Sequence, residues 1–146
     1  MSVDGRVYLD TSALAKWYLN ETRSEAFVEY LLGVDVAVIS SLTRVEMRSL
    51  LSRRRRMGEL TIDLEGLLFA AFTDDLQRGW LQLYPVNDER FSEATNLINR
   101  YPEFPLRTLD ALHLVVAQQA GIEALATADT VMADTASAMG FAVMRF

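Results

Sequence analysis

The chain has 146 residues, 51% of them hydrophobic and 23% charged, a size and composition that indicate one globular domain and exclude a disordered segment. It contains no cysteine, which excludes disulfides, zinc–thiolate sites and a thiol nucleophile. The formal net charge of −6 repels polyanions at long range, so nucleic acid could bind only through a local basic patch.

Signals for export and for membrane insertion are missing from the sequence. No apolar run approaches the ~20 residues that cross a bilayer. The first ten residues, MSVDGRVYLD, lack the basic and apolar regions of a secretory signal. We therefore expect a cytoplasmic protein with no membrane contact, folded as one domain over residues 1–146.

Short apolar strands alternate with amphipathic helices along the chain. In chain order, we expect a strand at 6–9, helices at 11–19 and 24–32, a strand at 34–39, helices at 41–57 and 62–78, a strand at 80–86, helices at 88–100 and 108–121, a strand at 124–127, a helix at 129–139 and a strand at 141–145. Thr61 and Thr108 are expected to cap the helices that follow them. The alternation predicts an α/β fold, a three-layer α/β/α sandwich with a central, mainly parallel sheet.

Two acids follow predicted strands directly. Asp10 ends the run VYLD, and Asp129 ends ALATAD. In parallel sheets ligands bind outside the carboxyl ends of the strands, so both positions favour a functional site. Each acid could instead cap the next helix, although beside Asp10 both Thr11 and Ser12 could serve as caps equally well.

Two further acids lie within predicted helices, next to apolar side chains. Glu46 borders the apolar stripe of its helix, where an unpaired charge is costly, unless it pairs with Arg48 or Arg53. Asp110 lies in LRTLDALHLVVA, an almost wholly apolar helix, and is expected to be buried in the core. Its position in the first turn is also explained by the helix dipole alone.

These four acids can converge on one crevice of a parallel sheet. Carboxylates brought that close would not all ionise unless a cation neutralised them. Oxygen ligands suit Mg²⁺ or Mn²⁺, and the lack of cysteine together with a single histidine disfavours zinc. A metal held in this way can activate water and offset charge on a phosphoryl oxygen, which is the chemistry of phosphodiester hydrolysis.

Four stretches of the chain resemble the motifs of the PIN-domain ribonucleases, and most closely those of the VapC-type toxins of bacterial toxin–antitoxin pairs. In order, they are LDTSALAKWYLNE, SSLTRVEMRSLLSRRRRMGEL, LRTLDALHLVVAQQAG and LATADTVMADTASAMGFAV. Each motif is weak alone, but four in order and at familiar spacing are specific. The resemblance covers nearly the whole chain.

The resemblance implies an α/β/α fold and an endoribonuclease that depends on Mg²⁺ or Mn²⁺ and leaves a 5′-phosphate and a 3′-hydroxyl. Asp10, Glu46, Asp110 and Asp129 match the catalytic acids. Asp10, Asp110 and Asp129 are expected to hold the metal, and Glu46 could be either a ligand or the group that deprotonates water. Ser12 and Thr127 match supporting hydroxyl positions. The family also implies an RNA substrate, a cognate antitoxin and a homodimer.

Other polar residues near the motifs are given smaller roles. His113 shares an apolar face of its helix, so we expect a half-buried histidine without a catalytic role, although three residues after Asp110 it could hydrogen-bond near the site. Arg44 and Arg48 lie close to Glu46 in the sequence and are the candidates for contacting RNA in the groove. The run 53–56, four arginines, is expected to form a solvated helix end, with contact to RNA phosphate or to the antitoxin as the alternative.

Two other functions are compatible with parts of this pattern. A haloacid-dehalogenase-like phosphatase also has an acid after its first strand, but it needs a second acid two residues later, where this chain has Ser12. It also needs a lysine beyond the middle of the chain, and the single lysine is Lys16. A non-catalytic binding module could keep the fold and use the acidic groove for a protein partner.

Overall fold

Five parallel strands form the centre of the molecule. The computed structural model describes residues 5–146, and the prediction of one domain over 1–146 includes four residues outside that range. The strands are β1 (Arg6–Leu9), β2 (Val36–Ser40), β3 (Leu81–Tyr84), β4 (Ala124–Thr127) and β5 (Ala142–Arg145). They pair in the order β3-β2-β1-β4-β5, and every pair is parallel.

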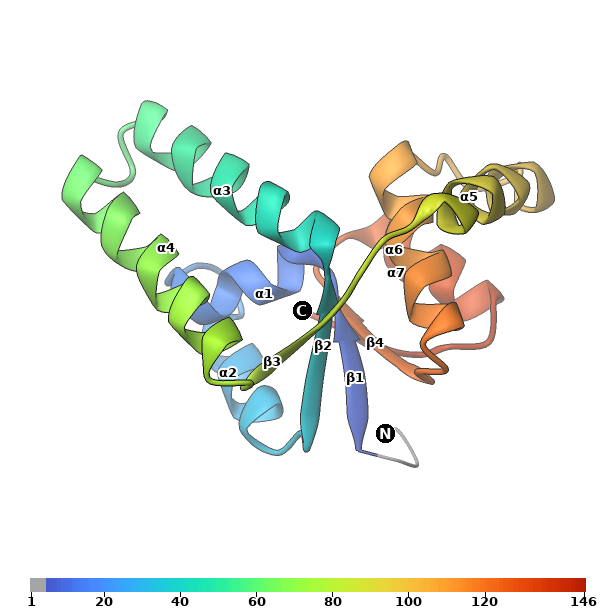
Figure 1. Ribbon diagram of the computed structural model, residues 1–146, viewed down its shortest axis with the longest axis horizontal. Helices are drawn as coiled ribbons and strands as arrows, with labels where there is room; N and C mark the ends of the chain where they lie inside the picture. The colour runs from blue at the N-terminus through green and yellow to red at the C-terminus, as the bar shows by residue number, and fades with distance from the viewer. Residues whose placement is uncertain (1–4) are drawn as a thin grey trace.

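Seven helices cover the two faces of this sheet in the part of the chain from residue 5 onward. They are α1 (Thr11–Tyr18), α2 (Ser24–Leu32), α3 (Ser41–Arg56), α4 (Ile62–Gln77), α5 (Asp88–Arg100), α6 (Thr108–Gln119) and α7 (Thr130–Ala138). Helices α1 to α4 lie on one side of the sheet and α5 to α7 on the other (Figure 1). The predicted three-layer sandwich is confirmed.

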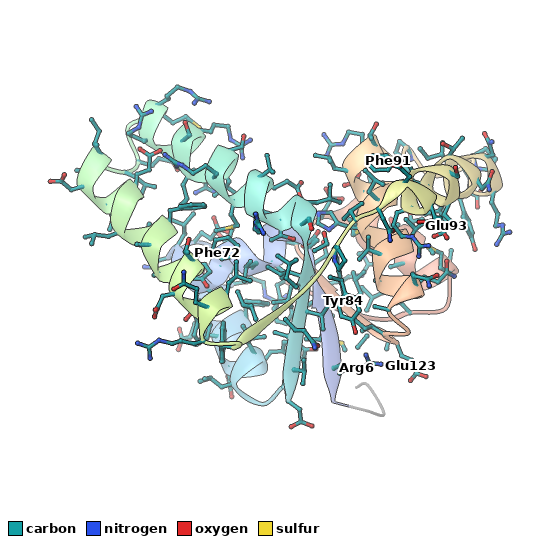
Figure 2. The ribbon with its side chains drawn as sticks, in the orientation of Figure 1. Arg6, Phe72, Tyr84, Phe91, Glu93 and Glu123 are labelled. Atoms are coloured by element: carbon teal, nitrogen blue, oxygen red, sulfur yellow. The ribbon has the colours of Figure 1, made fainter. Side chains whose placement is uncertain are left out.

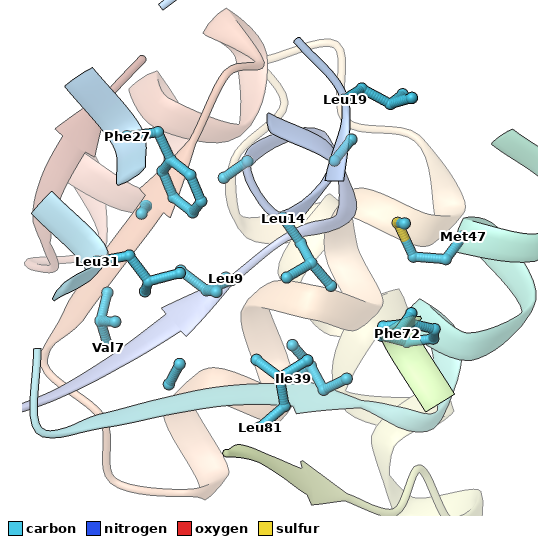
Figure 3. Packing of buried hydrophobic residues seen from close by; sticks show 14 of the residues in the cluster. Val7, Leu9, Leu14, Leu19, Phe27, Leu31, Ile39, Met47, Phe72 and Leu81 are labelled. Atoms are coloured by element: carbon cyan, nitrogen blue, oxygen red, sulfur yellow. The ribbon is translucent and has the colours of Figure 1, made fainter. Parts of the chain in front are cut away.

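The alternation of side chains along the strands creates two cores. In β1, Val7 and Leu9 face helices α1 to α4, whereas Tyr8 faces α6 and α7. Figure 3 shows the first of these cores, in which Phe72 and Ile39 pack with Leu9. Phe72 points inward from α4 and is fully buried (Figure 2).

Several element boundaries differ from the predicted ones by one or two residues, for local reasons. Strand β2 begins at Val36, not at Val34, because the Val34 N–H still donates to the Leu31 carbonyl at the end of α2. Strand β3 ends before Pro85, which has no N–H to donate to a ladder. Thr108 is the first residue of α6 and not its cap.

The strand order reverses beside β1, because the chain adds β2 and β3 on one side of it and then β4 and β5 on the other. Such switch points leave a crevice at the carboxyl ends of the strands. Asp10 and the loop that leads to Asp129 follow the two strands that border the switch, β1 and β4.

Among residues 5–146, no helix is long and apolar enough to cross a membrane. The predicted absence of a secretory signal concerns a stretch whose first four residues lie outside the described range.

Candidate functional site

A cavity of about 440 Å³ lies at the carboxyl edge of the sheet, and all four predicted acids line it. Asp10 reaches it from the end of β1, Glu46 from α3, Asp110 from α6 and Asp129 from the start of α7. Helices α3 and α6 belong to opposite layers and form its two sides (Figure 1). Residues up to 119 positions apart in the sequence are therefore brought to one place, as the sequence predicts.

Asp10 is both a helix cap and a member of this cluster. Its Oδ1 accepts the Ala13 N–H at 3.0 Å and the Ser12 hydroxyl at 2.8 Å, and its Oδ2 accepts the Thr127 hydroxyl at 2.5 Å. The side chain that caps α1 is thus that of Asp10, and the alternative of Thr11 as the cap is wrong. Burial raises the pKa of the Asp10 carboxyl, and the Thr127 hydrogen bond opposes that shift.

Thr127 and Ser12 link Asp10 to the Asp129 side of the cavity. The Thr127 Oγ1 accepts the Asp129 N–H at 2.9 Å while it donates to Asp10. The Ser12 Oγ accepts the Ala128 N–H at 2.9 Å while it also donates to Asp10. Both predicted supporting hydroxyls therefore hold the ends of β1 and β4 in register.

Asp129 occupies the N-cap position of α7. Its Oδ1 accepts the Met132 N–H at 2.9 Å, so Asp129, like Asp10, both caps a helix and lines the cavity. The Oδ2 points toward Arg107.

Glu46 is held at one oxygen by two donors from other elements. Its Oε1 accepts the Thr11 hydroxyl at 2.9 Å and lies 2.5 Å from Nε2 of His113. Burial would raise the pKa of Glu46, but the hydrogen bond and charge of His113 and the Thr11 hydroxyl outweigh it and hold the pKa below its usual value. The alternative that Glu46 pairs with Arg48 or Arg53 is wrong.

His113 has a larger part in the site than its sequence context suggested. It is 2% exposed rather than half-buried, and its Nδ1 lies 2.6 Å from the Tyr8 hydroxyl. With Nδ1 against the Tyr8 hydroxyl, the ring presents Nε2 to Glu46, and a proton on Nε2 is donated to the Glu46 carboxylate. The signal that could have found this contact is weak: Tyr8 carries a hydroxyl between the apolar residues Val7 and Leu9, and His113 is one turn from Asp110.

Asp110 lies at the rim of the site, with its side chain 14% exposed, rather than in the core. Partial burial and the nearby charge of Asp129 raise the pKa of its carboxyl. One guanidinium lies near both acids: Arg107 is 3.7 Å from Oδ2 of Asp110 and 3.7 Å from Oδ2 of Asp129.

The profile of the PIN domain matches residues 7–138 of this sequence. The chain belongs to the PIN-domain family. Among its relatives, Ribonuclease VapC46 of Mycobacterium tuberculosis is 33% identical over 144 residues, covering 94% of this chain and 95% of its own length. Ribonuclease VapC35 of the same species is 35% identical over 144 residues with the same coverage.

Solved structures share the fold of this PIN domain. VapC20 of Mycobacterium tuberculosis, described as a sarcin-ricin loop cleaving toxin, superposes with a TM-score of 0.74 at 19% identity, covering 96% of this chain and 99% of its own. FitAcB of Neisseria gonorrhoeae superposes with a TM-score of 0.67 at 16% identity, covering 95% and 96%. At these identities the likeness concerns the fold.

The arginines that line the PIN-domain cavity are not the two predicted from the sequence. Neither Arg44 nor Arg48 is among its lining residues; Arg53 and Arg107 are. Arg48 instead binds Glu65 at 3.0 Å. Nearness to Glu46 along the sequence was a poor guide, because residues two positions away on a helix point in other directions.

The residue types in this PIN-domain cavity fit a hard divalent cation, since four carboxylates line it and hard cations prefer oxygen ligands. Within residues 5–146, however, no three carboxylates or histidines form a group ready to hold one ion. Arg107 lies beside Asp110 and Asp129, and hydroxyls occupy both oxygens of Asp10. The donor chemistry fits a metal. Binding one requires Arg107 to leave the two acids, whereas Oδ2 of Asp10, which accepts only the Thr127 hydroxyl, keeps a lone pair for the ion.

Proposed function

We propose that this protein is a metal-dependent endoribonuclease and the toxin of a VapBC-type toxin–antitoxin pair. The observation that carries the proposal is the convergence of Asp10, Glu46, Asp110 and Asp129 on one cavity at the switch point of the sheet. Membership of the PIN-domain family and relatives named ribonucleases over nearly their full length support the same activity.

In this proposal Asp10, Asp110 and Asp129 hold Mg²⁺ or Mn²⁺, and Glu46 is an additional ligand or a base. The bound ion would supply the positive charge that activates water and stabilises the phosphoryl oxygens during hydrolysis. The Ser12 and Thr127 hydroxyls would keep the Asp10 carboxylate in one orientation, as they do here.

Glu46 has one oxygen left for chemistry. Thr11 and His113 both bind Oε1, and Oε2 takes part in none of the hydrogen bonds among residues 5–146. The lowered pKa keeps this carboxylate ionised at neutral pH, so Oε2 can accept a hydrogen bond from an attacking water and orient it toward phosphorus.

The test is RNA cleavage with Mg²⁺ or Mn²⁺ by the wild-type protein and by Asp10→Asn. We expect cleavage that requires the metal, yields 5′-phosphate ends and is lost in Asp10→Asn, because the substitution removes the buried carboxylate charge. Asp134→Asn is the matched control: Asp134 lies on the neighbouring helix α7, is paired with Arg145 and does not line the cavity.

Absence of cleavage of any structured RNA by folded, metal-bound wild-type protein would contradict the enzyme and favour the non-catalytic binding module. The phosphatase alternative loses its support, since Ser12, where a second acid would be needed, donates to Asp10.

We further propose a cognate antitoxin, a homodimer and a site of action in the cytoplasm, where cellular RNA is found. One structure with this fold is a toxin–antitoxin complex from Klebsiella pneumoniae, with a TM-score of 0.59 at 17% identity over 85% of this chain and 87% of its own. Sedimentation of the purified protein measures the oligomeric state.

A further inference from the structure

An acidic protein that cleaves RNA needs cations where the phosphates enter. The net charge is −6, and four carboxylates line the cavity. Most arginines near it are already bound to acids elsewhere: Arg54 binds Glu21 at 2.8 Å, and Arg55 binds Glu65 at 2.6 Å. Two arginines line the cavity itself, Arg53 and Arg107.

Arg53 extends the acidic face of α3. Glu46, Ser49, Leu50 and Arg53 follow a spacing of three, four and seven residues, which places them on one side of the helix, and all four line the cavity. Seven residues advance about 10 Å along a helix axis. Arg53 is exposed, and its side chain makes no hydrogen bond or ion pair with residues 5–146. Its guanidinium is therefore free to bind a phosphate of an RNA strand that runs along α3 past Glu46.

Arg107 stands on the other side of the cavity, at the start of α6. Its side chain is 80% exposed, and its two ion pairs with Asp110 and Asp129 are both long, at 3.7 Å. Pairs of this length with the guanidinium in solvent are weak. The guanidinium therefore offsets the charge of two neighbouring acids while remaining free to swing away.

We propose that Arg53 and Arg107 bind RNA phosphates from opposite sides of the acidic cavity. Until a divalent cation displaces it, the Arg107 guanidinium supplies the positive charge beside Asp110 and Asp129. The planar guanidinium can bind phosphate through two parallel hydrogen bonds, which suits both residues to this task. The inference rests on the proposed function and assigns the substrate contacts of that same site.

The first test measures how salt weakens RNA binding. A fluorescein-labelled RNA hairpin is titrated with Asp10→Asn protein, which does not cleave it, in Mn²⁺ at increasing NaCl. Adding Arg53→Gln or Arg107→Gln should weaken binding and reduce the slope of log Kd against log salt by about 0.7 for each lost phosphate contact with single-stranded RNA.

Two other arginines of α3 serve as comparisons. Arg56→Gln is the matched control, because Arg56 hydrogen-bonds to Ser52 and does not line the cavity, and it should leave the slope unchanged. Arg44→Gln tests the contact predicted from sequence. An unchanged slope in Arg53→Gln and Arg107→Gln, or a loss in Arg44→Gln alone, would overturn the proposed phosphate contacts.

The second test is calorimetric titration of Mn²⁺ into the otherwise wild-type protein without RNA. Arg107→Gln should bind Mn²⁺ about two- to fivefold more tightly, because an exposed competing ion pair is removed, and Arg53→Gln should match wild type. Weaker or unchanged Mn²⁺ binding in Arg107→Gln would overturn its role beside the acids. Both readouts are binding constants, so they stand even if the RNA cleavage assay fails.

Discussion

Thr127 ties two of the four acids together through a single hydroxyl. It donates to Asp10 Oδ2 and accepts from the Asp129 N–H, and it is completely buried. Thr127→Val keeps the shape of the side chain but leaves a buried carboxylate oxygen without its donor, which should lower the free energy of unfolding by about 1–3 kcal/mol.

Thr127→Ser is the matched variant, because it keeps the hydroxyl and loses one methyl group, at a cost of about 1 kcal/mol. Urea denaturation of the wild type, Thr127→Val and Thr127→Ser measures the differences in the free energy of unfolding. The pKa of Asp10 should rise further in Thr127→Val, because the hydrogen bond that opposes its rise is lost. Equal stability of the two variants would show that the hydroxyl does not hold the acid.

Sequence reasoning located the acids and the two hydroxyls that bind Asp10, but it missed the side-chain partners of the other three acids. Asp10 and Asp129 are visible because strand ends and capping positions are local patterns. The contact of His113 with Glu46 spans 67 positions between two helices in opposite layers, and no local pattern encodes it. Arg107 was missed for the same reason, since its partner Asp129 belongs to a different element.

At the scale of elements, the pair α3 and α4 is joined by a buried carboxylate. Glu65 on α4 is 4% exposed and binds both Arg48 and Arg55 of α3. The run 53–56 is accordingly not a uniformly solvated helix end, because two of its arginines bind acids of other segments. The order of helices and strands was predictable, because apolar residues recur with a different period in each. Which helix faces pack together was not predictable in this way.

The contacts of Glu65 with Arg48 and Arg55 should make the free energy of unfolding depend on pH. Burial would raise the pKa of Glu65, but the guanidinium groups of Arg48 and Arg55 outweigh it and hold the pKa below its ordinary value of 4.5. A carboxyl whose pKa is lowered by folding stabilises the native state above its ordinary pKa and loses that contribution as pH falls through the lowered value. Glu65→Gln should therefore lower Tm at neutral pH, and its deficit relative to wild type should shrink in acid.

Asp74→Asn is the control for this measurement. Asp74 also forms an ion pair, with Arg78 one turn along α4, but both side chains are more than half exposed, and such pairs contribute little. Thermal unfolding followed by circular dichroism across the acid range gives both curves. A Glu65→Gln deficit that is constant with pH would assign its effect to packing rather than charge.

At the scale of the whole molecule, the cavity that holds the acids is open to solvent at the edge of the sheet, with exposed arginines at its rim. Of residues 5–146, none closes over it as a lid. If the proposed activity is right, RNA can reach the acids directly, and the proposed antitoxin supplies the restraint. Expression of this chain alone in a bacterial host should then slow growth.

The growth experiment separates catalysis from a general burden of expression. Asp10→Asn should restore growth at equal protein level, because it removes one of the four carboxylates that line the cavity. Asp134→Asn should remain as harmful as wild type, because Asp134 pairs with Arg145 and does not line the cavity. Co-expression of a small reading frame found beside the gene should relieve the effect of the wild-type chain. Growth unaffected by well-folded wild-type protein would contradict the toxin role while leaving the fold intact, and slow growth with Asp10→Asn would point to binding rather than cleavage as the cause.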